Sequence, residues 1–494
     1  MPAPANAVTL AVLTDVHYGA AGALAQRRSE MADILLLRAV MRLNRLVKPD
    51  VTLVLGDVLD DGAAPGAPER LAHVRTILDE LDSPYLVIPG NHDGDPEAFY
   101  RVFDRPGDVV DLCGVRFLPF VDAEEPGYNA SRRPVDLARF QQARAEYDGP
   151  IVALQHVCLA PPERVLAPYN YTNAGEIVRA MRDAGVVLSV SGHHHPGTPD
   201  LRNDTTTFVT APGLCESPFP YLLITLDRDR VTTAHRQLAM HEHLGLVDTH
   251  VHTELAYCSD KMTVEAAIAL ARDFGLAGIG FAEHSGQLYF EARRYWSGEC
   301  LQQGIAGARL EDERMPAYVA LRERHARPGV RFGLEVDCDF RGDLLLKPRD
   351  RQGFDYLIGA IHRLPGLTRP APPVETLVDV YLGLLARLLR NGIDILAHPF
   401  RVFHWAGLVP PEALFPPVVR LLREAGVAAE LNFHANQPPL AFVREGLASG
   451  VRFAFGSDAH RPHEIGELAD HLALLEAAGF DGDLADVLVP LNRA

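Results

Sequence analysis

Short apolar runs recur along the chain, and most alternate with segments whose apolar residues are spaced as on one face of a helix. In the first part of the chain these runs are VTLAVLTD, VTLVLGD, YLVIPGN, IVALQH and VVLSVSGHHH, with helical spacing at 29–47 and 174–184. Such alternation predicts an α/β sandwich, in which helices flank the strands. The runs TTFVTAP, YLLITLD and VTTAHRQL follow without helices, and we expect them to close the edge of this domain.

A second series of apolar runs begins after residue 240, and most of its members are followed by a helical stretch. They read LGLVDTHVH, GIGFAEH, RFGLEVDCD, YLIGAIH, DILAHPF, AAELNFHA and RFAFGSDAH. Repeated strand-plus-helix units predict a β/α barrel, whose chemistry would lie at the carboxyl ends of its strands. We therefore expect two α/β domains, at residues 1–240 and 241–494.

Composition limits the classes of protein that these domains can represent. A chain of 494 residues is long for one core, and a formal net charge of −18 argues against binding long nucleic acid. Nothing approaches the roughly 20 apolar residues of a membrane span, and the N-terminus lacks the features of a signal peptide. The six cysteines are scattered without a C-x-x-C pair, which favours a reduced, cytoplasmic location.

Polar residues with oxygen or nitrogen donors follow successive strands of the first domain. One such residue is usually only a strand cap or part of a turn, but an ordered set at one edge of a sheet suits two divalent ions that share a carboxylate. The set comprises Asp15, His17, Asp57, Asn91, His92, His156, His193 and His195.

The order D-x-H, G-D-x-x-D, G-N-H-D, H, G-H-x-H resembles that of the calcineurin-like metallophosphoesterases, over about residues 8–236. The residues within these motifs are most similar to those of the class III cyclic-nucleotide phosphodiesterase branch. The resemblance implies two ions of Mn, Fe or Zn, one held by Asp15, His17 and His195, the other by Asn91, His156 and His193, with Asp57 bridging. It also implies that His92 stabilises the transition state or protonates the leaving oxygen. We expect Asp60 or Asp93 to orient His92.

A second ordered set follows the strands of the barrel. It comprises His250, His252, His284, Glu335, His362, His398, Asp458 and His460. The set resembles the PHP family (polymerase and histidinol phosphatase), from about residue 244 to the C-terminus. The resemblance implies a distorted seven-stranded β/α barrel with up to three ions. His250, His252, Glu335 and Asp458 would hold the first, Glu335 would bridge to a second held by His362 and His398, and His284 with His460 would hold a third.

The sequence allows two interpretations for each of two further residues near this set, Cys258 and Arg401. The family often has another histidine after H-x-H, where this chain has Cys258 with Asp260 close by. A thiolate there would favour zinc, but a buried structural cysteine is an equal alternative, so two or three ions of Zn, Mn or Fe are expected. Arg401 follows HPF and is either a phosphate clamp or a surface residue. Asn432 and His434 are candidates to support the ligands.

These sets predict a bifunctional, metal-dependent phosphohydrolase that acts on a small phosphorylated substrate through metal-activated water. We expect the first domain to hydrolyse a phosphodiester or cyclic phosphate and the PHP domain a phosphomonoester. One alternative is a nuclease, whose polymer binding would weaken steeply with salt. The other is that one domain is a metal-stabilised scaffold or regulatory module for an active partner domain.

Overall fold

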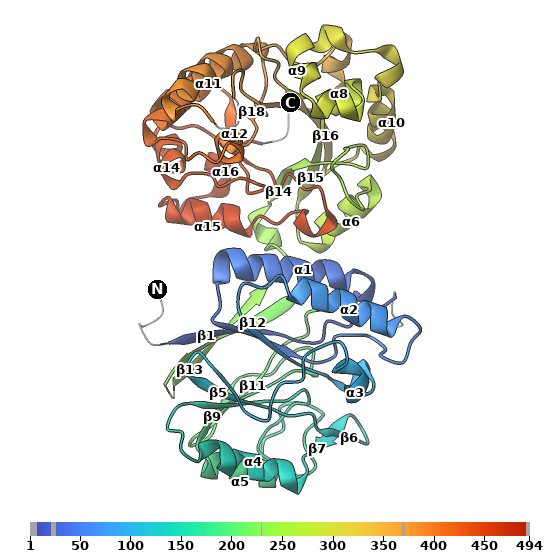
Figure 1. Ribbon diagram of the computed structural model, residues 1–494, viewed down its shortest axis with the longest axis vertical. Coiled ribbons are helices and arrows are strands. Elements are labelled where there is room, and N and C mark those ends of the chain that lie inside the picture. The colour runs from blue at the N-terminus through green and yellow to red at the C-terminus, as the bar shows by residue number, and fades with distance from the viewer. Residues whose placement is uncertain (1–6, 21–25, 229, 368–370, 491–494) are drawn as a thin grey trace. The chain divides into compact units, whose positions relative to one another are not determined.

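The computed structural model describes residues 7–20, 26–228, 230–367 and 371–490 and divides into two compact units, Met1–Ala239 and Met240–Ala494 (Figure 1). Within these described ranges, no helix is both long enough and apolar enough to cross a membrane. All six cysteines are free of disulfide bonds.

The first unit contains two sheets and a small hairpin. One sheet has the order β13-β12-β1-β2-β3, and the other has the order β10-β11-β9-β8-β5-β4. The strands of the first sheet are β1 Val8–Leu13, β2 Val51–Leu55, β3 Tyr85–Ile88, β12 Pro220–Asp227 and β13 Arg230–Gln237. Those of the second are β4 Val110–Leu112, β5 Val115–Pro119, β8 Ile151–Leu154, β9 Val186–Ser191, β10 Leu201–Arg202 and β11 Thr207–Thr210. The hairpin pairs β6 Ala123–Glu125 with β7 Asn129–Ser131.

Apolar side chains from both sheets form one core between them. Residues such as Leu53, Phe117 and Ile224 are fully buried there. Helices α1 (Ala32–Arg42) and α2 (Ala67–Leu78) lie beside the first sheet, and α4 (Pro134–Arg144) and α5 (Ala174–Asp183) beside the second (Figure 1). The short helix α3 spans Pro96–Phe99. A second apolar cluster joins α4 and α5 to the outer face of their sheet, so the predicted sandwich with flanking helices is confirmed.

The last three strands are divided between the two sheets, whereas the sequence led us to expect one edge. Strand β11 runs parallel to β9, while β12 runs antiparallel to β1 and pairs with β13. Strands β1, β2 and β3 are parallel neighbours, as are β8 and β9. The residues that follow these parallel strands therefore leave each sheet at the same end.

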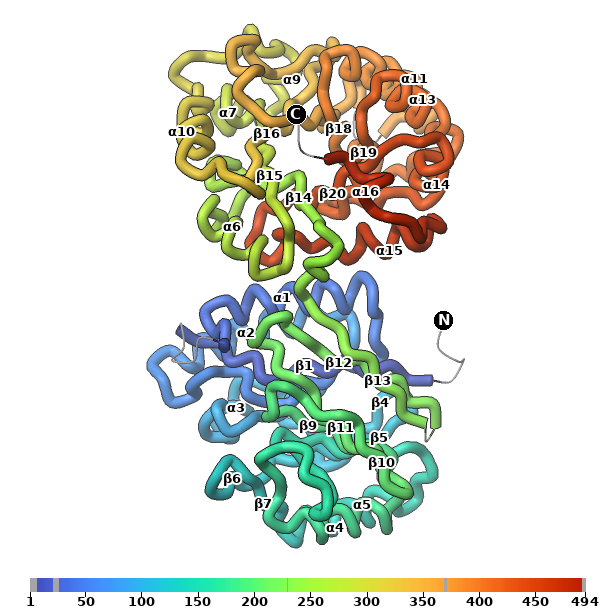
Figure 2. The backbone as a smooth tube through the Cα atoms, turned by 180° about the vertical axis from the view of Figure 1, so that it is seen from behind, coloured from blue at the N-terminus to red at the C-terminus, as the bar shows by residue number. Residues whose placement is uncertain are grey.

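The second unit is built on seven parallel strands in chain order from β14 to β20. They are β14 Val247–Val251, β15 Gly278–His284, β16 Val330–Asp337, β17 Leu357–Ala360, β18 Ile395–Leu396, β19 Ala428–Leu431 and β20 Phe453–Phe455. The first and last strands lie side by side (Figure 2). The Asp458 backbone N–H donates to the His250 carbonyl at 2.7 Å, and the His252 N–H to the Ala459 carbonyl at 3.0 Å. The predicted barrel is therefore confirmed.

Helices surround the barrel, and shorter ones follow individual strands. The longer helices are α6 Val264–Asp273, α10 Met315–His325, α11 Val374–Leu388, α13 Phe415–Ala425, α14 Leu440–Ala448 and α15 Ala469–Ala477. The shorter ones are α7 Ser285–Tyr289, α8 Ala292–Trp296, α9 Glu299–Gln303, α12 Arg401–Trp405 and α16 Leu484–Val487. Helices α7, α8 and α9 follow β15 and α12 follows β18, so they start from the carboxyl ends of barrel strands.

Candidate metal centres

Three predicted ligands of the first unit converge at the carboxyl end of β1. His17 Nε2 lies 3.1 Å from His195 Nε2, and Asp15 Oδ1 lies 3.4 Å from His195 Nε2. The second oxygen of Asp15 accepts hydrogen bonds from the Thr14 hydroxyl (2.7 Å) and the His193 N–H (3.0 Å). The carboxylate is thus held in place by one oxygen and presents the other to the two imidazoles.

A second group of donors lies beside the first and shares Asp57 with it. His156 Nε2 lies 3.2 Å from Asn91 Oδ1 and 3.1 Å from His193 Nδ1. Asp57 Oδ2 lies 3.2 Å from His156 Nε2 and 3.7 Å from His17 Nε2, so one oxygen faces both groups. Asp57 Oδ1 accepts the His92 N–H at 2.8 Å.

The far nitrogens of these imidazoles are held by oxygen acceptors. His156 Nδ1 donates to the Leu55 carbonyl at 2.6 Å, and His193 Nε2 to the Tyr128 carbonyl at 3.1 Å. His195 Nδ1 lies 2.7 Å from Glu216 Oε1, a residue that the motifs did not identify. Each bond fixes the ring so that its other nitrogen faces the cluster.

We expected the carboxylate of Asp60 or Asp93 to orient His92, but both carboxylates have other partners. His92 Nδ1 donates to the backbone carbonyl of Asp60 at 2.7 Å, whereas the Asp60 carboxylate lies 3.4 Å from His17 Nδ1. Asp93 accepts the N–H groups of Leu59 and Gly90, each at 2.8 Å, and so braces the loop. The carboxylate of Asp60 therefore supports His17, because the turn after β2 points its side chain there and its carbonyl toward His92.

Carboxylates and imidazoles of the first cluster shift one another's pKa values. Burial alone would lower the pKa of His156, but the negative charge of Asp57 raises it to about 9. Burial opposes ionisation of Asp15, yet the neighbouring His195 imidazole lowers the pKa of this carboxyl to about 2. The buried carboxylates thus draw positive charge into the cluster, which is the field that a divalent cation would experience.

Glu335 has the same central place in the barrel. Its Oε1 lies 2.8 Å from His398 Nε2 and 3.1 Å from His362 Nε2. Its Oε2 lies 3.7 Å from His250 Nε2 and contacts His284 Nδ1. The two oxygens therefore face two different groups of imidazoles, so Glu335 could be shared by two ions, one on each oxygen.

The remaining predicted ligands complete these groups. Asp458 Oδ1 lies 2.8 Å from His252 Nε2 and 3.6 Å from His250 Nε2, beside Glu335. His252, His284 and His460 form a buried triad of donors.

Cys258 lies at this triad. Its Sγ is 3.6 Å from His284 Nε2. Burial alone would raise the pKa of the thiol, but positive charge on His284 lowers it to about 5. Asp260 is exposed and donates its backbone N–H to the His460 carbonyl at 2.9 Å. The structure thus brings Cys258 to the proposed third site and leaves the Asp260 carboxylate in solvent.

Three buried acidic residues that the motifs missed orient the barrel's imidazoles. Glu430 Oε1 lies 2.7 Å from His250 Nδ1, and its Oε2 accepts the His398 N–H at 2.7 Å. Asp337 Oδ1 lies 2.8 Å from His362 Nδ1, and Glu283 Oε1 lies 3.2 Å from His252 Nδ1. The available signal was position: Glu283 and Asp337 stand on strands that carry the predicted ligands His284 and Glu335, and Glu430 stands on the strand that leads to Asn432.

Arg401 is buried, although the sequence equally allowed a surface position. Its Nη2 donates to Asn432 Oδ1 at 2.8 Å and to Asp458 Oδ2. His434 lies 3.3 Å from Glu464 and stacks on His460 with ring centres 4.7 Å apart. Arg401 and Asn432 therefore hold the Asp458 carboxylate, while His434 covers His460.

The donor sets of both units fit divalent metal ions. Asp15 Oδ1, His250 Nε2 and Glu335 Oε2 are buried and form no hydrogen bond, which is costly for atoms of this kind. Two atoms bound about 2.1 Å from one ion lie roughly 3 Å apart, close to the spacing observed here. Ions at these positions would satisfy the orphaned atoms and balance the buried carboxylates.

Cavities adjoin both clusters. In the barrel, a cavity of about 430 Å³ is lined by His284, His362, His460, Cys258 and Arg401 among others. In the first unit, a cavity of about 150 Å³ reaches Asn91, His156 and His193. Each cluster is therefore open to a substrate.

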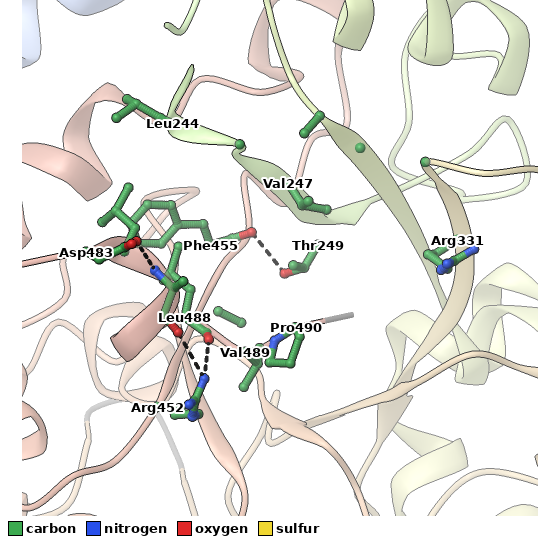
Figure 3. A pocket seen from close by; sticks show the side chains of 17 residues that line it. Leu244, Val247, Thr249, Arg331, Arg452, Phe455, Asp483, Leu488, Val489 and Pro490 are labelled. Atoms are coloured by element: carbon green, nitrogen blue, oxygen red, sulfur yellow. Dashed lines mark hydrogen bonds between the residues drawn. The ribbon is translucent and has the colours of Figure 1, made fainter. Parts of the chain in front are cut away.

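A larger cavity, of about 730 Å³, lies at the opposite, amino-terminal end of the barrel strands (Figure 3). Its walls include Val247, Arg331 and Arg452 but no histidine or cysteine. Arg452 is bonded to the Leu488 carbonyl at 2.8 Å, and the carboxylate of Asp483 accepts the Ala485 N–H at 2.9 Å (Figure 3). Its polar groups are engaged in structure, so we place the chemistry at the histidine-lined end.

Comparison with known proteins finds a different family model for each unit. The family model described as "Calcineurin-like phosphoesterase" matches residues 8–197, and that described as "PHP domain" matches residues 248–434. A "Probable histidinol-phosphatase" from Deinococcus radiodurans is 28% identical over 245 residues, 45% of this chain and 89% of that protein. A "Probable cyclic nucleotide phosphodiesterase" from Rhodococcus erythropolis is 28% identical over 175 residues, 33% of this chain, and the chain spans 56% of its length. A solved dimetal phosphatase from Danio rerio is 16% identical, covers 47% of this chain and 98% of its own, and has a TM-score of 0.37.

The chain is therefore a metal-dependent phosphoric ester hydrolase. It contains a calcineurin-like phosphoesterase domain followed by a PHP domain, and both resemblances inferred from the motifs are confirmed.

Proposed function

We propose that the protein is a bifunctional phosphohydrolase whose first domain opens a phosphodiester or cyclic phosphate and whose PHP domain removes phosphate from a monoester. The observation that carries this proposal is that each domain assembles its own donor cluster around its own shared carboxylate, Asp57 or Glu335. Consecutive hydrolyses would explain why the two domains are joined in one chain.

In the first domain, Asp15, His17 and His195 would hold one ion and Asn91, His156 and His193 the other, with Asp57 shared. Divalent ions in such a pair supply a water nucleophile at neutral pH and neutralise charge on the phosphoryl oxygens. His92 donates its Nδ1 proton to the Asp60 carbonyl, so Nε2 is the atom that can carry a proton to the leaving oxygen.

In the PHP domain, Glu335 would be shared between a site with His250, His252 and Asp458 and one with His362 and His398. His284, His460 and Cys258 would form the third site. Arg401 could bind the phosphate only through guanidinium N–H groups that do not donate to Asp458. Its observed bond to Asp458 supports a role in positioning the Asp458 carboxylate.

The test is a panel of phosphodiesters, cyclic nucleotides and phosphomonoesters, assayed with metal-free protein and after loading with Mn, Zn, Fe or Mg. We expect activity on both classes of ester only after loading, with two ions in the first domain and two or three in the second. Unchanged turnover of every ester by metal-free protein would refute the proposal. Activity on one class alone would favour a single active domain.

A further inference from the structure

The only two tryptophans of the chain line the same cavity, the one above the PHP cluster. Trp296 ends α8 and Trp405 ends α12, and their exposed fractions are 50% and 48%. Single exposed apolar side chains are common, but apolar rings that are exposed together in one cavity commonly mark a binding surface. Two such rings in one cavity of about 430 Å³ indicate that a ligand covers them.

Trp405 stands next to a side chain of the proposed ion sites, and Trp296 is connected to another through Tyr295. The Trp405 ring is nearly parallel to that of His362, with an angle of 17° and centres 6.1 Å apart. Trp296 packs edge-on against Tyr295 at 5.1 Å, and the Tyr295 ring lies 6.1 Å from that of His284. A phosphate at the cluster would therefore place the rest of its ester within reach of the indoles.

Exposed positive charges line the cavity. Arg363 and Arg461 line it and are exposed, and Arg363 is held by a 2.7 Å bond to the Trp296 carbonyl. These cations suit an anionic substrate.

The two carboxylates of the cavity wall are already engaged. Asp337 bonds His362 Nδ1 and the Gly286 N–H, each at 2.8 Å. Glu464 pairs with His434 and accepts the His460 and Arg461 N–H groups at 2.7 and 3.0 Å. The wall thus offers flat apolar faces and positive charge, and neither carboxylate is left free for an ammonium group.

We infer that the PHP domain takes a nucleoside monophosphate, with the base stacked on Trp405 or Trp296 and the phosphate at the cluster. This inference rests on the proposed monoesterase activity. Water opening a cyclic nucleotide breaks one P–O ester bond and leaves a nucleoside monophosphate; a second water breaks the remaining ester bond and gives a nucleoside and inorganic phosphate. The product of the first proposed reaction would then be the substrate of the second.

The test compares adenosine 5′-monophosphate with ribose 5-phosphate, which lacks the base, and with histidinol phosphate, which carries an amine. We expect metal-loaded protein to prefer adenosine monophosphate. Trp405→Leu or Trp296→Leu should raise its KM roughly tenfold or more, as loss of base stacking does, while changing turnover of ribose 5-phosphate by less than about twofold. Trp405→Phe should restore part of the loss, and Leu310→Ala, at an exposed residue outside the cavity, should change neither substrate.

Fluorescence provides a second readout that does not depend on turnover. Because both tryptophans lie in this cavity, adenosine monophosphate should quench the emission of the full chain, whereas ribose 5-phosphate and inorganic phosphate should not.

Equal KM values for adenosine monophosphate with and without the indoles, together with no quenching, would overturn the inference and leave the monoesterase proposal standing. If the protein preferred histidinol phosphate, the inference would be wrong and the substrate would be an amino-alcohol phosphate ester. If no monoester were turned over but adenosine monophosphate still quenched the fluorescence, the proposed monoesterase activity would be refuted and the inferred nucleotide-binding site would stand.

Discussion

Several proposed ligands have a backbone conformation that side-chain-bearing residues seldom adopt. Asp15, Asp57, His193 and Asp458 have φ values of 53°, 49°, 67° and 54°, all in the left-handed region. This conformation costs about 1–2 kcal/mol for a residue with a Cβ atom. All four lie in the turns that directly follow strands. The left-handed backbone conformation turns their side chains toward the clusters. Strained residues of this kind are commonly found at functional sites.

Cys258 is the residue whose proposed role can be isolated most cleanly. Cys258→Ser should remove at most about one ion per chain and leave measurable monoesterase activity, because the ligands of the other two barrel sites remain. It should also abolish thiolate-to-metal absorption in cobalt-loaded protein. Metal analysis and near-ultraviolet spectra would check both outcomes.

Cys300 provides the matched control for this prediction. It lines the same cavity, but burial raises the pKa of its thiol to about 12, so it stays protonated. Cys300→Ser should therefore keep the full metal content and the absorption band. If Cys258→Ser instead abolished activity in a folded protein, the third ion would be required for the chemistry.

At the scale of elements, parallel strands bring the ligands together and glycines allow the turns to approach. A Cβ atom on Gly90 would overlap the Asp57 carboxylate and lie 2.8 Å from His156 Cε1. Gly90 itself is extended, with φ −105°, so the obstacle to a side chain here is space and not backbone conformation. The loop after β3 thus depends on a glycine to reach the ligands that follow β2 and β8.

Gly90→Ala should therefore damage the first cluster without unfolding the domain. A displacement of Asp57 or His156 by about 1 Å is expected to lower diesterase kcat/KM on the order of a hundredfold. Gly175→Ala is the control, since its added Cβ would meet only Pro162 at an ordinary 3.4 Å. Diesterase activity of Gly90→Ala equal to that of the control would show that the loop can yield and that the glycine is not needed.

At the scale of the whole molecule, each compact unit has its own apolar core and its own shared carboxylate. Effects of substitutions in separate units should be nearly additive. The two proposed activities should therefore be separable by single substitutions.

Asp57→Asn should abolish diesterase activity and spare monoesterase activity, and Glu335→Gln should do the reverse. Losses on the order of a hundredfold or more are expected, because each carboxylate serves two ion positions. Asparagine tolerates the left-handed conformation of residue 57, so the fold should persist. Chromogenic diesters and monoesters would measure both activities. A folded single variant that loses both equally would indicate one composite site.

Metal removal should make stability depend on pH. Burial alone would lower the pKa values of His156 and His362, but Asp57 and Glu335, respectively, raise each to about 9. In metal-free protein these charged pairs stabilise the fold fully below the ordinary histidine pKa of about 6.5, and the contribution is lost as pH rises through about 9. The Tm gap between metal-loaded and metal-free protein should therefore widen between these pH values. Calorimetry showing a constant or narrowing gap would contradict the prediction.

The sequence by itself determined the fold class, the two families and the enzyme class. The reason is local: apolar runs define strands, and the His, Asp and Asn that end them are adjacent in the chain to the strands that position them. The order of these motifs was sufficient to identify both domains, although the ion assignments of the individual residues remain predictions.

Only the tertiary structure decided which groups support these motifs. Glu430 reaches His250 because barrel closure brings their strands together, and Arg401 is buried because Asp458, distant in the chain, pairs with it. The Asp60 carboxylate faces His17 because of the turn it occupies, and Trp296 and Trp405 share a cavity although they lie on separate helices. Such contacts join residues far apart in sequence, and no periodicity or local motif encodes them.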